Sequence, residues 1–198
     1  MDRSKISRII PIALTLVIAA VIIAAFISLI RFVFFSGPTT SNSTTDIGNS
    51  SLINTSADRA VSLTVRGPIV ADESFRSYQI KVSPTGRSLV VYKGYIEEPI
   101  KTITLTNNTK AYEQFVYALD KANMMKGVEV KNNNDLRGVC APGNIHEYQT
   151  LKSDVVQKGL WTSSCSGSRG TLNASSVQLN SLFVAQIPGS RDIINNIW

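Results

Sequence analysis

The chain has 198 residues, of which 43% are hydrophobic, and a formal net charge of +6. One histidine and two cysteines cannot supply the three or four ligands of a zinc site if the cysteines are bonded to each other. Ser-His-Asp catalysis would have a single candidate base, and the chain lacks the sequence pattern of a nucleophile elbow.

The chain begins with a hydrophobic segment. Residues 9–30 carry no charge over 22 positions, and a helix of that length spans a bilayer core of about 30 Å. Three basic residues precede the segment and Arg31 alone closely follows it. The positive-inside rule therefore predicts a cytoplasmic tail (1–8), a transmembrane signal anchor (9–35) and export of the rest. The alternative is a cleaved signal peptide, which would export the same residues.

A polar segment follows the anchor. Residues 36–59 are rich in Ser, Thr, Asn and Gly, and their few apolar residues show no periodicity. Such a stretch cannot bury enough apolar surface to offset the entropy lost on ordering. We therefore expect a flexible stalk over 36–59 that tethers an extracytoplasmic domain formed by residues 60–198.

The first part of this domain has the pattern of antiparallel strands. Apolar and polar residues alternate in segments that are joined by short turns such as Ser83–Gly86. The alternation predicts strands near residues 61–65, 78–82, 89–92 and 100–106.

The rest of the domain mixes helices with a second hairpin. A helix is expected after an N-cap at Asn108, with an apolar stripe from Tyr112 to Ala122 and Gly127 just beyond its end. Further along, we expect a hairpin at 146–151 and 160–163, a helix near 177–186 and a short last turn after residue 190. The fold class is therefore α+β, an antiparallel sheet with two or three helices on one face.

Cys140 and Cys165 are the only cysteines, and an even count in an oxidising compartment predicts a disulfide between them. The alternative is a catalytic thiol at Cys165. Residues 161–165, followed by Arg169, resemble the Thr-Leu-x-Thr-Cys segment and downstream arginine of sortases, which are also anchored by an N-terminal helix. That resemblance covers fewer than ten residues, and His146 lies too near Cys165 in sequence for the sortase arrangement. We therefore assign the disulfide.

Other reactive residues have structural interpretations. His146 is expected to be a structural or exposed histidine. Glu97 and Glu98 are neighbours on a strand, so their side chains should point to opposite faces and be solvated. The Gly-rich stretch 166–170 has no P-loop lysine. We assign no catalytic, cofactor-binding or metal-binding residue.

The charge pattern bears on partners. Beyond residue 35 there are 16 basic and 13 acidic residues, scattered along the chain, so we expect no specific nucleic-acid site, and at most a weak attraction to anionic envelope polymers. The sequence predicts a single-pass membrane protein whose domain lies at the cell surface or in the periplasm. We expect this domain to serve in binding or assembly without catalysis, with an envelope protein or an anionic polymer as its partner. The alternative is an envelope hydrolase or transferase, which would need a concave site with convergent polar groups.

Overall fold

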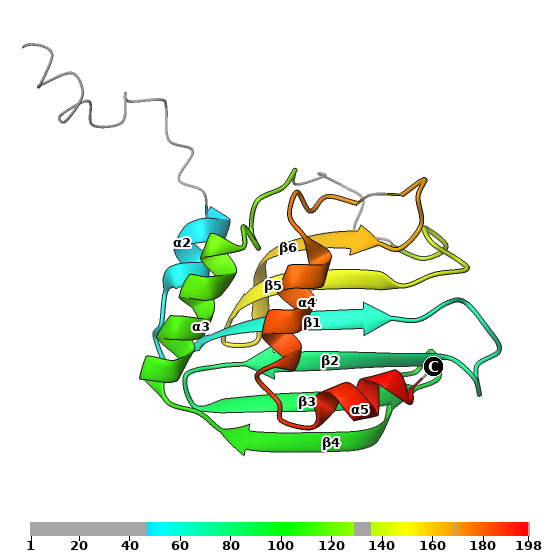
Figure 1. Cartoon of the computed structure of the whole chain (residues 1–198), viewed down its shortest axis with the longest axis horizontal. Coiled ribbons are helices and arrows are strands. Elements are labelled where there is room, and N and C mark those ends of the chain that lie inside the picture. Colours follow the sequence, from blue (N-terminus) through cyan, green and yellow to red (C-terminus); the bar gives the residue numbers. More distant parts are fainter. Residues whose placement is uncertain (1–46, 129–135, 169, 198) are drawn as a thin grey trace, which may run out of the picture. The chain divides into compact units, whose positions relative to one another are not determined.

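The structure is a computed structural model that describes residues 47–128, 136–168 and 170–197 (Figure 1). These residues belong to one compact unit that begins at Thr45. The expected cytoplasmic tail, the expected anchor and residues 36–46 of the expected stalk lie outside the described residues. Within the described part, no helix has both the length and the apolar character needed to cross a bilayer.

A six-stranded sheet forms the centre of the domain, in the order β4-β3-β2-β1-β5-β6, and every neighbouring pair is antiparallel. The first four strands form a meander, and β5 returns to pair with the free side of β1. This arrangement confirms the strands and the second hairpin expected from alternation. The strands are β1 (Arg59–Arg66), β2 (Arg76–Val82), β3 (Gly86–Lys93), β4 (Glu98–Thr106), β5 (Ile145–Lys152) and β6 (Val155–Ser163).

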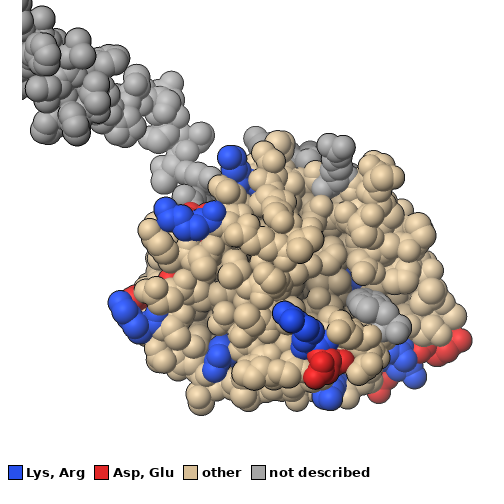
Figure 2. Space-filling model, in the orientation of Figure 1, with Lys and Arg blue, Asp and Glu red and all other residues tan. Residues whose placement is uncertain are grey.

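The four helices of the described residues lie on one face of the sheet, as Figure 1 shows, which confirms the α+β class. The sequence predicted two or three helices on that face. They are α2 (Ile47–Ile53), α3 (Thr109–Lys121), α4 (Ser176–Val184) and α5 (Ser190–Asn195). Lysine and arginine side chains are scattered over this helix-covered side rather than gathered in one patch (Figure 2).

The core lies between the helices and the sheet. Strand register places Leu63 between Ile80 and Tyr148, so alternate apolar side chains of three strands share the face beneath the helices. Phe115 of α3 meets Phe183 of α4 edge to face, with ring centroids 5.2 Å apart. Complete burial of each such side chain contributes about 1.5–3 kcal/mol to stability. Helices α3 and α4, which the sequence predicted, therefore cover the apolar face of the sheet and complete the core.

Two sequence expectations are corrected by the structure. The expected flexible stalk (36–59) includes α2, which packs against α3, β5 and β6 and buries Leu52 completely. The expected helix end at Gly127 is also wrong. The chain leaves α3 after Lys121, and Asn123, with φ of 59°, takes the left-handed conformation. Gly127 instead forms an isolated bridge with Leu172.

The other face of the sheet is polar. Gln79 and Glu147 are the register partners of Thr64, and the amide of Gln79 donates to the Thr64 hydroxyl at 3.1 Å. At the end of this face, Arg66 of β1 is the register partner of Ile145 of β5. The four described helices pack on the opposite face, so none of them covers this end of the polar face.

Candidate functional site

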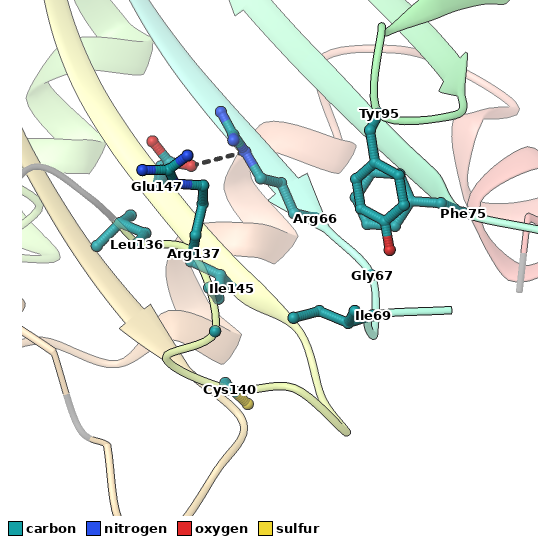
Figure 3. A pocket seen from close by; sticks show the side chains of 11 residues that line it. Arg66, Gly67, Ile69, Phe75, Tyr95, Leu136, Arg137, Cys140, Ile145 and Glu147 are labelled. Atoms are coloured by element: carbon teal, nitrogen blue, oxygen red, sulfur yellow. Dashed lines mark ion pairs between the residues drawn. The ribbon is translucent and has the colours of Figure 1, made fainter. Parts of the chain in front are cut away.

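A cavity of about 500 Å³ lies at the end of the polar face (Figure 3). Its walls come from the end of β1 and the loop after it, from Phe75 and Tyr95, from the segment 136–140 and from the start of β5. Ligand pockets usually have volumes of about 300–1,000 Å³ and combine apolar walls with a few polar groups. The size and mixed lining make this cavity the candidate functional site.

One wall is an aromatic pair. The rings of Phe75 and Tyr95 stack with centroids 4.2 Å apart and planes inclined by 19°. The Tyr95 hydroxyl donates to the Val70 carbonyl at 2.7 Å and accepts from the Val70 N–H at 3.2 Å. The Tyr95 backbone N–H donates to the Asp72 carboxylate at 2.7 Å. These bonds join two loops, so the wall is formed before any ligand arrives.

Gly94 allows the Tyr95 loop to approach the Asp72 carboxylate. Its φ is 71°, and a Cβ at this position would lie 2.9 Å from Asp72 Oδ1. A residue with a side chain would therefore strain the backbone and displace the carboxylate that holds the Tyr95 N–H.

Charged groups lie at another end of the cavity (Figure 3). Arg66 Nε is 3.0 Å from Glu147 Oε1, and Arg66 Nη2 is 3.9 Å from Glu97 Oε1. The first contact is an ion pair without the alignment of a hydrogen bond, and no described residue donates a hydrogen bond to the buried Glu147 Oε1. Arg137 lies beside the pair in the same wall (Figure 3).

Burial raises the pKa of Glu147 at the charged end of the cavity. The Glu147 side chain is 15% exposed. Desolvation raises the pKa of the Glu147 carboxyl, the positive charge of Arg66 opposes the rise and the negative charge of Glu97 adds to it. Glu147 therefore holds its proton more tightly than an exposed glutamate does.

The disulfide contributes a further wall. Cys140 and Cys165 are bonded, with 5.7 Å between their Cα atoms, as the sequence predicted. Around the bond, Asn144 N–H donates to Ser164 Oγ at 2.8 Å, and Ser164 N–H donates to the Asn144 carbonyl at 2.9 Å. The bond thus fastens the segment that carries the lining residue Cys140 to the chain just after β6.

Comparison with known proteins identifies no relative. No family model, no curated protein and no solved structure matches this chain. Any functional proposal therefore rests on the residues described above.

His146 is a structural histidine on the other face of β5. Its Nδ1 lies 3.0 Å from Asn180 Nδ2, and Asn180 Oδ1 accepts from the Tyr148 hydroxyl at 2.7 Å. Because an amide NH₂ only donates, Nδ1 is the acceptor and the ring is neutral. Burial lowers the pKa of His146. The histidine therefore joins α4 to the sheet and lies outside the cavity lining.

Glu97 and Glu98, which the sequence predicted to be solvated, lie in different elements. Glu97, with φ of 56°, sits in the turn before β4, and its half-exposed carboxylate contacts Arg66. Glu98 begins β4 and is exposed. Within the described residues, no group of three His, Cys, Asp or Glu side chains is placed to hold a metal ion.

Sequence reasoning missed the main site residues. Arg66, Tyr95 and Glu147 come from separate segments, and no local motif links them. The only signal that could have found them is the pairing of β1 with β5. Arg66 pairs with Ile145, and Glu147, two residues further along β5, lies on the same face of the sheet as Arg66.

Proposed function

We propose that this protein is a membrane-anchored binding module whose cavity beside Arg66 and Glu147 receives a small ligand outside the membrane. One observation carries the proposal, the 500 Å³ cavity in which an aromatic and aliphatic wall faces a half-buried ion pair. Apolar walls supply most of the binding free energy, and a few oriented polar groups supply specificity.

The proposed location follows from the hydrophobic run at 9–30 and the basic residues before it. The disulfide supports it, because such bonds persist in oxidising compartments. Protease added to intact cells stripped of their wall should digest the described domain. Full protection of that domain would contradict an external location.

Filling the cavity tests the binding function. Ile69 lines the cavity and is 52% exposed, so Ile69→Trp should occupy the space without disturbing the core. Ile96 is 87% exposed and lies outside the lining, which makes Ile96→Trp the matched control. The full chain in lipid nanodiscs should show saturation transfer to members of a fragment library. The signals should be lost in I69W and kept in I96W.

Two results would oppose the proposal. The first is a library that yields no bound fragment. The second is a set of bound fragments whose signals survive in I69W, because these would bind elsewhere on the protein or in the nanodisc.

The second candidate is an envelope hydrolase or transferase, and one observation favours it. Glu147 combines a raised pKa with a place in a cavity, which is the condition of many general acids. Incubation of the full chain with isolated envelope polymer should then release soluble fragments, and Glu147→Gln should abolish the release while fragment binding persists. Absence of release with the wild-type chain opposes this candidate and leaves the binding module.

A further inference from the structure

We propose that the cavity selects an organic monoanion, with its carboxylate at the arginines and an apolar or aromatic body against the opposite wall. This inference rests on the proposed binding function and names the class of its ligand.

The charge of the lining favours an anion. Two guanidinium groups, Arg66 and Arg137, and one carboxyl group, Glu147, line the cavity. Arginine stays protonated at any ordinary pH, so the lining residues carry two positive charges and, when Glu147 is ionised, one negative charge. Glu97 lies outside the lining, with its Oε1 3.9 Å from Arg66 Nη2, and its side chain is 51% exposed, so its charge offsets the positive charge of the lining only in part.

The geometry of Arg66 leaves donors for such an anion. Glu147 approaches Nε, whereas Glu97 is 3.9 Å from Nη2, which is beyond hydrogen-bond distance. A guanidinium has five N–H groups in a planar fork, and its terminal nitrogens match the two oxygens of a carboxylate. A bound carboxylate would therefore accept from Arg66 N–H groups for which no hydrogen bond to a described residue is found.

The rest of the lining suits an apolar body. Ile69, Ile145, Cys140 of the disulfide and the stacked Phe75 and Tyr95 surround the remaining volume (Figure 3). A ligand with a second charge would place that charge against these side chains and lose its hydration without a partner. A single acidic group on a ring-sized apolar body fits both parts of the lining.

Three probes of nearly equal shape test the assignment. They are 2-naphthoate (anion), 2-naphthamide (neutral) and 2-naphthylmethylamine (cation), added to the full chain in nanodiscs of zwitterionic lipid. Methyl NMR of ¹³C-labelled isoleucines provides the readout, with Ile69 and Ile145 reporting on the cavity. Ile100 and Ile193 line a separate hollow between β4 and α5, so they report on binding elsewhere.

We expect naphthoate to shift Ile69 and Ile145 and to bind at least about tenfold more tightly than naphthamide, as a charge-assisted contact allows. Arg66→Gln should reduce naphthoate affinity toward that of naphthamide, and Arg137→Gln, at an exposed position, should weaken it to a lesser extent while the fold is kept. Lys101→Gln, at an exposed lysine beside the other hollow, is the matched control and should change nothing.

The failures are distinguishable. If no probe shifts Ile69 or Ile145 and the fragment library also yields no cavity-bound member, the proposed function itself is wrong; if library fragments bind in the cavity but naphthoate does not, only the anion assignment is overturned. If naphthamide or the amine binds as tightly as naphthoate, the cavity binds ligands but the anion assignment is overturned. Naphthoate affinity that stays unchanged in both arginine variants overturns it as well.

Discussion

Arg66 and Glu147 lie diagonally across the β1–β5 pair, with Arg66 Nε 3.0 Å from Glu147 Oε1. The contact exists because Arg66 is the register partner of Ile145, which places Glu147 two residues further along β5 on the same face. A shift of this register by one residue would send Glu147 to the helix-covered face. The register that pairs apolar core residues thus also assembles the charged end of the cavity.

Glu147→Gln should change how stability depends on pH. The raised pKa means that the folded state binds a proton more readily than the unfolded state between the ordinary value of 4.5 and the raised value. Stability therefore falls as pH rises through that window. Urea unfolding of the full chain, followed by tryptophan fluorescence, should show the stability of the variant increasing relative to wild type from pH 4.5 upward. A difference that stays constant with pH contradicts the raised pKa.

His146→Gln should act in the opposite direction. The lowered pKa means that the unfolded state binds the proton more readily below the ordinary value of 6.5. Wild-type stability is therefore complete above about pH 6.5 and is lost as pH falls toward the folded-state pKa. The chain has one histidine, so the glutamine variant should lack this histidine-dependent loss entirely. An unchanged pH profile between 6.5 and 5 would show that His146 is not buried as described.

The elements that the sequence predicted are those with local signals. Alternation over residues 61–65 and the 3.6-residue stripe from Tyr112 to Ala122 each reflect one side of an element that packs on a core. Helix α2 had no such signal, because Leu52 is buried within a segment that is mostly polar in sequence. A helix of seven residues is not stable alone, so packing on α3 and the sheet determines it.

The site could not be predicted from local pattern. Arg66 reads as the polar end of a strand, Tyr95 as a turn residue and Glu147 as a polar position in a hairpin. Their meeting depends on the pairing of β1 with β5, which joins segments far apart in the chain. The disulfide was predicted from cysteine count, but its place in the cavity wall depends on the same non-local pairing.

Replacing both cysteines by serine should destabilise the domain and weaken the site. The bond closes a loop with a sequence separation of 25, and the chain-entropy model gives roughly 3–4 kcal/mol for a loop of this size. We expect a lower urea midpoint in the double variant. Naphthoate should also bind less tightly, because the segment with Cys140 would no longer be fastened beside β6. Wild-type protein treated with a reductant strong enough to open the bond should show the same two changes, whereas an unchanged midpoint would contradict a structural role.

Gly94→Ala should loosen the aromatic wall. At φ of 71° an alanine is strained, and its Cβ would meet Asp72 Oδ1 at 2.9 Å. The left-handed backbone alone costs about 1–2 kcal/mol for a residue with a side chain. The displaced Asp72 would no longer accept from the Tyr95 N–H, so naphthoate affinity should fall together with stability. Gly167→Ala is the matched control, because a Cβ there meets nothing within 4 Å and its φ is not positive. Equal effects of the two substitutions on naphthoate affinity would show that the hydrogen bond from the Tyr95 N–H to Asp72 does not shape the cavity.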